Sequence, residues 1–392
     1  MKTQASAKGE CTQPRLLLVV NQLESFLNHR LPIALAAQKA GYDVHVAMSE
    51  ADEARQQDSH GLTFHNLPLI RSFGNPVREI RSLRRLVGLI DDIRPDVVHA
   101  FTLKPSLTVG LVSHIRKRPL TVVSITGLGS FFAGTSATDR VVQSIAAILG
   151  RLALGAGNAQ VVLQNEDDLA LVGRRFGIPT DRMSLTKGSG VDLSAFAPQP
   201  EPDGPIRIVL AARMIADKGI REFVAAARLL REQSIEAKFV LAGGLDEENR
   251  SAVEADELTK WSNEEVVDWI GRVSDMAALY RGCHIACLPS RYREGVPKSL
   301  IEAAACGRPA VTTDMPGCRD IVVDETTGLI VPPNNVDALA KALARLIIDD
   351  DLRQKFGAAA RKHVENGYSV EAVTGQVMAL YETGRRAARP AS

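Results

Sequence analysis

The residues best able to do chemistry are two glutamates in the segment SRYREGVPKSLIEAAACG, residues 290–307. Glu294 and Glu302 lie eight positions apart, and carboxylates accept hydrogen bonds from hydroxyl groups such as those of a sugar. If helical geometry held from one to the other, they would be turned by roughly 80° beyond two full turns and could line one cleft. The same spacing is explained equally well by a surface glutamate and an ordinary amphipathic helix.

A helix is expected just after the first of these glutamates. Pro297 is favoured in a first helical turn and Gly307 just past a last one, so the helix should begin at about Pro297 and end before Gly307. The free N–H groups of such a helix start attract anions, phosphate above all. A segment that offers carboxylates to hydroxyls and N–H groups to phosphates suits a nucleotide sugar.

Two cations could serve the same phosphates. In residues 211–219, Arg213 follows an expected strand and Lys218 precedes an expected helix. Fixed cations would stabilise a departing diphosphate, with each charge-assisted hydrogen bond contributing roughly 1.5–3 kcal/mol. Taken alone, the pair is better explained as two solvated cations in a connection. Gly243 and Gly271 end two further strands, where a backbone can approach a ligand or simply turn.

Polar residues also follow expected strands in the first half of the chain. His99 and Lys104 lie at the end of one strand, and a flexible segment, residues 126–129, follows another. Ligands bind at the carboxyl ends of parallel strands, so we expect these residues to face the ligand. A buried, hydrogen-bonded His99 is an equally good interpretation.

A basic amphipathic helix is expected at residues 77–90. Its apolar positions recur at helical spacing, and we expect them to pack on a sheet. Arginines between them form either a solvated face or a surface for an anionic membrane. The apolar positions are Val77, Ile80, Leu83, Val87 and Ile90, and the arginines are Arg78, Arg81, Arg84 and Arg85.

The whole chain has ordinary globular composition, and its 392 residues favour two domains. A net charge of +1 gives no nucleic-acid signature. Residues 1–196 carry 22 Lys/Arg against 17 Asp/Glu, a bias that suits a phosphate-bearing or membrane-surface partner. Because no run of eighteen apolar residues and no signal peptide are evident, we expect a soluble or peripheral protein.

The five cysteines are scattered, which indicates a reducing cytosol. Cys283, His284 and Cys287 are spaced closely enough to suggest a metal site. Their segment continues as an apolar run typical of a buried strand, in which free cysteine acts as a small hydrophobe, so we expect no metal there. Likewise, Asp349–Asp351 is expected to be a turn between helices.

Apolar runs alternate with helical patterns, which predicts an α/β fold with mainly parallel sheets covered on both faces. A linker with four prolines in residues 197–205 divides the chain, and the pattern restarts after it. We expect a disordered N-terminus at 1–14, doubly wound domains at 15–198 and 206–368 facing across a cleft, and a final helix in 369–392 returning toward the first domain. The expected strands are 15–20, 44–48, 97–100, 122–125 and 161–164, then 206–211, 239–242, 266–270, 285–288, 310–313 and 329–331.

Together these motifs resemble those of the family 4 glycosyltransferases. Arg213 with Lys218, then Gly243, the run Glu294–Pro297 and Glu302 occur in that family's order and approximate spacing, within a resemblance over about residues 15–385. The resemblance implies two Rossmann-like domains of the GT-B type and a retaining reaction. It also implies a nucleotide-sugar co-substrate, with no cofactor and no metal.

The resemblance further implies a role for each motif. Arg213 and Lys218 would hold the diphosphate, Glu294 the donor sugar and Glu302 the ribose, with Arg213, Lys218 and Glu294 as the catalytic set. Further donor-binding residues would be Gly243, Ile270, Gly271, Arg272, Gly295, Val296, Pro297, Lys298, Ser299 and Leu300.

The first domain looks like that of a bacterial subgroup that transfers hexoses or N-acetylhexosamines to undecaprenyl-diphosphate-linked sugars. Segments 26–32, 99–105 and 125–129 carry this resemblance. Two departures leave the acceptor contacts open: Thr126 and Gly127 stand where many members have a histidine, and the glycine-rich first loop is absent. The acceptor-binding residues implied are His29, Arg30, His99, Thr102, Lys104, Thr126 and Gly127.

The implied function is transfer from a nucleotide sugar, most commonly of UDP, to a lipid-diphosphate-linked sugar in surface glycan biosynthesis. The protein would act in the cytoplasm, on the inner face of the cytoplasmic membrane, held to anionic lipid by its basic first half. A UDP-sugar 2-epimerase of the same architecture and a non-catalytic nucleotide-sugar-binding subunit are the alternatives. An epimerase leaves the acceptor resemblance unexplained, and the intact motif set argues against a binding subunit.

Overall fold

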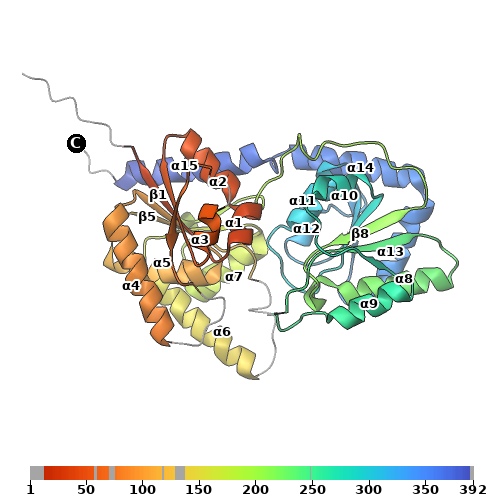
Figure 1. Ribbon diagram of the computed structural model, residues 1–392, viewed down its shortest axis with the longest axis horizontal. Coiled ribbons are helices and arrows are strands. Elements are labelled where there is room, and N and C mark those ends of the chain that lie inside the picture. The colour runs from red at the N-terminus through yellow and green to blue at the C-terminus, as the bar shows by residue number, and fades with distance from the viewer. Residues whose placement is uncertain are drawn as a thin grey trace, which may run out of the picture. The chain divides into compact units, whose positions relative to one another are not determined.

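The computed structural model describes residues 13–56, 60–69, 76–116, 119–128, 137–247 and 249–388. Helices separate most of the strands, and every strand pairing given for the two sheets is parallel, so the predicted α/β class is confirmed (Figure 1). The expected disordered N-terminus falls almost wholly in residues 1–12, which lie outside the described residues. The chain divides into two compact units.

Unit 1 comprises residues 1–124, 157–160 and 377–392. Its strands are β1 (Arg15–Val19), β2 (Asp43–Met48), β3 (Thr63–Asn66), β4 (Val97–Phe101) and β5 (Leu120–Ser124). Its helices are α1 (Leu23–His29), α2 (Leu31–Lys39), α3 (Ala51–Gln56), α4 (Pro76–Ile93), α5 (Leu103–Ile115) and the part of α15 (Val370–Ala388) that begins at Val377. The first sheet has the strand order β3-β2-β1-β4-β5-β6-β7.

Unit 2 comprises residues 125–156 and 161–376. Its first elements are α6 (Ala137–Gly150), β6 (Gln160–Leu163), α7 (Glu166–Phe176) and β7 (Met183–Leu185). The second sheet, of order β10-β9-β8-β11-β12-β13, is built from β8 (Arg207–Ala211), β9 (Lys238–Ala242), β10 (Asp268–Trp269), β11 (Ile285–Leu288), β12 (Ala310–Thr313) and β13 (Gly328–Val331). Its helices are α8 (Ile220–Glu232), α9 (Ala255–Asn263), α10 (Met276–Arg281), α11 (Lys298–Ala305), α12 (Cys318–Ile321), α13 (Val336–Ile348) and α14 (Asp350–Glu365).

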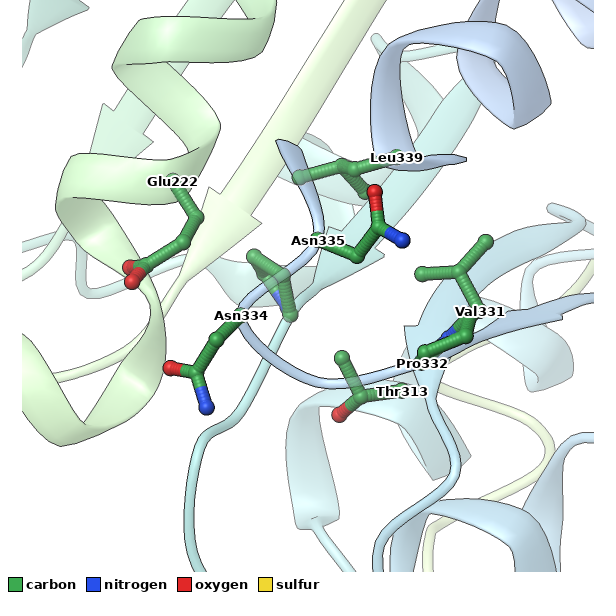
Figure 2. Close-up of a pocket in the computed structure, with 8 residues that line it drawn as sticks. Glu222, Thr313, Val331, Pro332, Asn334, Asn335 and Leu339 are labelled. Carbon is green, nitrogen blue, oxygen red and sulfur yellow. The ribbon is translucent and has the colours of Figure 1, made fainter. Parts of the chain in front are cut away.

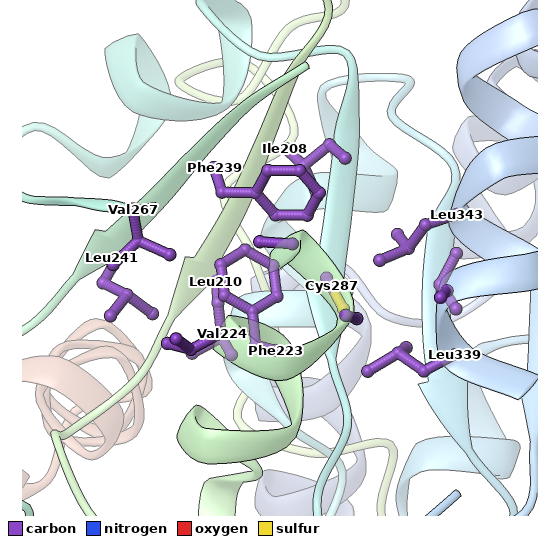
Figure 3. Close-up of a cluster of buried hydrophobic side chains, with 14 of the residues drawn as sticks. Ile208, Leu210, Phe223, Val224, Phe239, Leu241, Val267, Cys287, Leu339 and Leu343 are labelled. Carbon is purple, nitrogen blue, oxygen red and sulfur yellow. The ribbon is translucent and has the colours of Figure 1, made fainter. Parts of the chain in front are cut away.

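Helices cover both faces of the second sheet, which explains its uninterrupted apolar strands. On β8, Ile208 and Leu210 pack into one core with α8, α9 and α13, whereas Val209 and Ala211 pack into a second core with α10, α11 and α14. Successive strand residues point to opposite faces, so a strand covered twice must be apolar at every position. Cys287 is one of the buried side chains of the first core (Figure 3).

Cys283 and Cys287 are free, buried cysteines on either side of His284. His284 accepts a hydrogen bond at Nδ1 from the Arg207 N–H at 3.0 Å, and its Nε2 lies 3.0 Å from the Pro202 carbonyl oxygen. Among the described residues, no group of three or more His, Cys, Asp or Glu side chains is placed to hold a metal ion.

Some element predictions were wrong. The helix α1 was not predicted; it ends at His29 and α2 begins at Leu31, because Pro32 lacks the N–H that would continue α1. The strand expected at 266–270 is reduced to β10, and the short strands β3 and β7 were not predicted. Asp349–Asp351 is not a turn: Asp349 caps α14 by accepting the Leu352 N–H at 2.9 Å, and the other two lie in the first turn of that helix.

Candidate functional site

The segment from Ser290 to Gly307 forms a loop and a helix, as predicted. Pro297 is the N-cap of α11, and Gly307 follows its end with a φ of +72°. Glu294 lies in the loop before the helix, as the expected helix start at about Pro297 implies, so helical geometry does not run from Glu294 to Glu302. Pro297 itself is extended, with a φ of −63° and a ψ of 119°, and the helix begins at the next residue. Only Glu302 is placed by α11.

Lys218 and Glu294 meet directly. Lys218 ends a short 3₁₀ turn, Ala216–Lys218, ahead of α8, and its Nζ lies 2.6 Å from Glu294 Oε1. Gly219 makes this approach possible: its φ is +76°, and a Cβ there would lie 2.0 Å from the Pro289 carbonyl oxygen. The loop that carries Lys218 is thereby held against the loop that carries Glu294.

The ion pair is buried and includes a hydroxyl group. The side chains of Lys218 and Glu294 are 14% and 9% exposed. The fully buried Ser290 donates its hydroxyl to the same Glu294 Oε1 at 2.9 Å. Burial disfavours the charge of Lys218, but the neighbouring Glu294 carboxylate outweighs it and raises the pKa of Lys218. Lys218 is therefore a cation at neutral pH.

Tyr292 lies beside the same cation. Lys218 Nζ is 5.3 Å from the centroid of the Tyr292 ring. Burial raises the pKa of the Tyr292 hydroxyl, opposed by the positive charges of Lys218 and Arg213. Arg213 is therefore within electrostatic range of the group. Its guanidinium pairs with Asp246, whereas half of its side chain is exposed.

The other predicted donor residues lie at neighbouring strand ends. A Cβ on Gly243 would lie 1.7 Å from the Ala212 carbonyl oxygen, so only glycine fits between β9 and the Arg213 segment. The Gly243 N–H donates to the Gly271 carbonyl at 2.7 Å, which joins the ends of β9 and β10. Ile270 is 42% exposed there, next to Gly271 and Arg272.

Glu302 lies on α11 and is nearly buried. Lys298 Nζ lies 3.4 Å from its Oε1, one helical turn away. Burial raises the pKa of Glu302, and the Lys298 ammonium opposes that rise. Ser299 belongs to the first turn of the same helix.

Two predicted donor side chains, Val296 and Leu300, are core residues. They are 6% and 2% exposed and pack in the second apolar core. The Val296 N–H already donates to Gln164 Oε1 at 3.1 Å. The Gly295 backbone beside them lies close to Gly127, where a Cβ would be 2.9 Å from the Gly295 nitrogen. Gly127, predicted for the acceptor, therefore lies against the donor loop, next to Thr126.

The predicted acceptor residue His99 belongs to unit 1. Its surroundings match the alternative interpretation of a buried, hydrogen-bonded histidine. It is fully buried, with Nδ1 2.6 Å from Tyr381 Oη and Nε2 2.7 Å from Ser124 Oγ. Burial, and next the charge of Arg30, hold its pKa well below the ordinary value, so the ring is neutral. In this arrangement both ring nitrogens are bonded within the chain.

The other acceptor candidates of unit 1 also make internal contacts. Lys104 is 5% exposed and lies 2.6 Å from Glu79 Oε1. Arg30 is 6% exposed, with its guanidinium carbon 4.5 Å from the Phe101 ring centroid. Thr102 accepts a hydrogen bond from Asn21 Nδ2 at 2.9 Å, and His29 ends α1.

A small pocket lies elsewhere on unit 2, by the ends of β12 and β13 (Figure 2). Its lining residues are Glu222, Pro289, Thr313, Val331, Pro332, Asn334, Asn335 and Leu339. None of them is a predicted site residue, and the space between them does not admit a nucleotide sugar. The chemistry-bearing group is the one around Glu294.

Sequence reasoning missed Ser290, Tyr292 and Asp246. Ser290 and Tyr292 are within four residues of Glu294, so their nearness was visible, but nothing in the spacing shows which way a hydroxyl points. Asp246 lies 33 residues from Arg213, and only the adjacency of β8 and β9 brings them together.

Comparison with known proteins gives the family. Residues 193–363 match the family described as glycosyl transferases group 1, and residues 15–157 match glycosyl transferase 4-like. The capsular polysaccharide biosynthesis glycosyltransferase CapM of Staphylococcus aureus is 27% identical over 356 residues, 88% of this chain and 91% of that protein. The N,N'-diacetylbacillosaminyl-diphospho-undecaprenol alpha-1,3-N-acetylgalactosaminyltransferase of Campylobacter jejuni is 25% identical over 371 residues, 91% of this chain and 96% of its own.

A solved structure shows the fold. Anabaena Alr3699/HepE, in complex with UDP and glucose, has a TM-score of 0.75 at 15% identity, with 94% of this chain and 100% of that chain covered. At this identity the likeness shows the fold, which is the GT-B type with two Rossmann-like parallel sheets. On these matches, the chain belongs to the family 4 glycosyltransferases and is a glycosyltransferase.

Proposed function

We propose that this protein transfers a hexose or N-acetylhexosamine from a UDP-sugar to a lipid-diphosphate-linked sugar, with retention of configuration, in bacterial surface glycan biosynthesis. The observation that carries the proposal is the buried Lys218–Glu294 pair with Arg213 in electrostatic range. One side of this group is cationic and suits a diphosphate, and the other offers carboxylate oxygen to hydroxyls. A nucleotide sugar presents those two groups side by side.

Each side chain has a physical task in this proposal. Lys218 has three N–H donors, so it can keep its bond to Glu294 and still donate to a phosphate. Arg213 exchanges Asp246 for a phosphate or shares its guanidinium between them, since the planar fork has five N–H donors. Both cations stabilise the charge that develops on the leaving diphosphate. The start of α11 directs further N–H groups to the phosphates.

Glu302 binds the ribose hydroxyls, and Glu294 binds the donor sugar. Burial removes water from Glu302 and thereby raises its pKa. The ribose hydroxyl groups donate hydrogen bonds to its carboxylate and so replace part of that lost hydration. The chemistry needs no cofactor in this scheme, because the fixed cations do the work of neutralising the leaving group.

Two relatives support the acceptor class. One is named for a diphospho-undecaprenol acceptor and the other for capsular polysaccharide biosynthesis, and each matches about nine tenths of this chain. The GT-B structure named for its complex with UDP supports UDP as the donor nucleotide. Because the proposed acceptor is lipid-linked, we propose that the reaction takes place at the inner face of the cytoplasmic membrane.

Exposed apolar side chains support docking on an anionic membrane. The expectation that the whole apolar stripe of α4 packs on a sheet holds only in part: Ile90 is buried, as are Leu86, Leu89 and Ile93, whereas Val77 and Ile80 are 75% and 50% exposed. The exposed arginines of the same helix lie beside them. On α6, the exposed apolar residues are Val141, Val142, Ile145 and Ile148. Arginine with apolar neighbours is the pattern that binds anionic lipid surfaces. No helix in the described part of the chain is long and apolar enough to cross a membrane.

The test is a donor screen against a synthetic lipid-diphosphate sugar, followed by mass spectrometry. We expect one UDP-sugar to add a single hexose or N-acetylhexosamine, and NMR of the product to show the donor's anomeric configuration. A new UDP-sugar formed without acceptor would instead identify an epimerase. UDP binding without turnover on any acceptor would identify a binding subunit.

A further inference from the structure

The two oxygens of the Glu294 carboxylate are in different environments. Oε1 accepts from Lys218 Nζ at 2.6 Å and from Ser290 Oγ at 2.9 Å. Oε2 accepts no hydrogen bond from the residues that the structure describes, and the residue keeps 8% exposure. Oε2 is therefore the oxygen left for a ligand.

Ser290 is held rigidly where it donates. It is fully buried just after β11, and its carbonyl oxygen accepts from Thr313 Oγ1 at 2.5 Å. The next residue, Arg291, donates its N–H to the Asp217 carbonyl at 2.8 Å, so the Lys218 turn is tied to the same loop. The Ser290 hydroxyl also lies 3.4 Å from two carbonyl oxygens, but Glu294 Oε1 is the nearest acceptor.

Lys218 alone does not fix the orientation of the carboxylate. Its ammonium is a point charge on a flexible stem, and the terminal torsion of glutamate has a broad, roughly two-fold profile. A carboxylate bound only to Lys218 can rotate and keep its ion pair. A second donor from a rigid position, aimed at the same oxygen, removes that freedom.

We propose that Ser290 is a positioning residue that turns Glu294 so that Oε1 faces Lys218 and Oε2 faces the donor sugar. This inference rests on the proposed function, in which Glu294 binds that sugar. Ser290 itself contacts no substrate. Its effect is on the reacting geometry and not on the nucleotide, because UDP lacks the group that Oε2 binds.

The test compares Ser290→Ala with Thr312→Val, which removes another fully buried hydroxyl, one that donates to the Leu288 carbonyl at 2.7 Å and does not touch Glu294. Ser290→Cys, a weaker donor of similar size, is the second variant. Steady-state transfer is measured with the donor found in the screen, and calorimetry compares UDP with UDP-N-acetylgalactosamine and UDP-glucose.

We expect Ser290→Ala to lower kcat about ten- to hundredfold, the scale of a small misplacement in an active site. Its affinity for UDP should stay within about twofold of the parent, Ser290→Cys should be intermediate, and Thr312→Val should keep kcat. Equal losses of kcat and of UDP affinity in Ser290→Ala, or no loss of kcat, would overturn the proposal.

A crystal structure of Ser290→Ala separates this inference from the proposed function. If the parent protein transfers no sugar, the proposed function fails on its own, and the orientation of Glu294 still decides the role of Ser290. We expect the carboxylate of the variant to rotate or to occupy two orientations. A carboxylate unchanged from the parent, with Oε1 still on Lys218, would show that Ser290 does not position it.

Discussion

Two buried polar clusters differ in what they leave unbonded: one surrounds Glu294, in the loop after β11 of unit 2, and the other surrounds His99, within β4 of unit 1. Glu294 shares one oxygen with Lys218 and Ser290 and keeps the other oxygen without a partner in the described part of the chain. His99 is neutral and has both nitrogens bonded to Tyr381 and Ser124. A group prepared for a ligand keeps unused bonding capacity, and a group that supports the fold does not.

The largest difference between the two clusters should appear when the charged side chains of the Lys218–Glu294 pair are replaced. Lys218→Ala and Glu294→Gln should each lower kcat by about 10²–10³, the loss typical of removing one preorganised group from a transition state. Circular dichroism should show a folded protein, although breaking a buried pair costs about 3–5 kcal/mol of stability. Full transfer activity in either variant would refute the assigned role.

The matching change in unit 1 should give the opposite result. His99→Gln leaves Tyr381 and Ser124 poorly bonded and should lower the free energy of unfolding by about 1–3 kcal/mol. Transfer activity per folded molecule should stay close to that of the parent. A large loss of activity with unchanged urea stability would restore His99 as an acceptor-binding residue.

The pH dependence of stability sharpens the same contrast. The pKa of His99 is lowered in the folded state by burial and by Arg30, so below about pH 6.5 the unfolded chain binds a proton that the folded chain does not. Stability should therefore fall as the pH drops below that value. Urea unfolding between pH 7 and 5 should show a smaller drop in His99→Gln than in the parent. Equal drops would mean that the ring is not held neutral.

The smallest effect on the reaction in solution should come from the arginines of α4. Reversing Arg81, Arg84 and Arg85 to glutamate should weaken flotation with vesicles that contain anionic lipid and leave transfer to a short, soluble acceptor nearly unchanged. Vesicle binding equal to that of the parent would contradict docking through this helix.

Sequence alone predicted what depends on neighbours in the chain. The start of α11 was predicted from Pro297 and its end from Gly307. The strands of the second sheet were predicted from apolar runs, because helices cover both faces of that sheet and each strand must be apolar on both sides. It did not predict contacts made by folding, since Tyr381 is 282 residues from His99 and Asp246 is 33 from Arg213. The exposure of Val77 and Ile80 at the start of α4 was not predicted either, because helical spacing does not show where along a helix the packing begins.

The most direct test is a crystal structure of the protein with UDP. The phosphates should lie within hydrogen-bonding distance of Lys218 and Arg213 at the start of α11, with Glu294 still bonded to Ser290 through Oε1. A nucleotide bound away from these residues would contradict the assignment of the Glu294 group as the donor site.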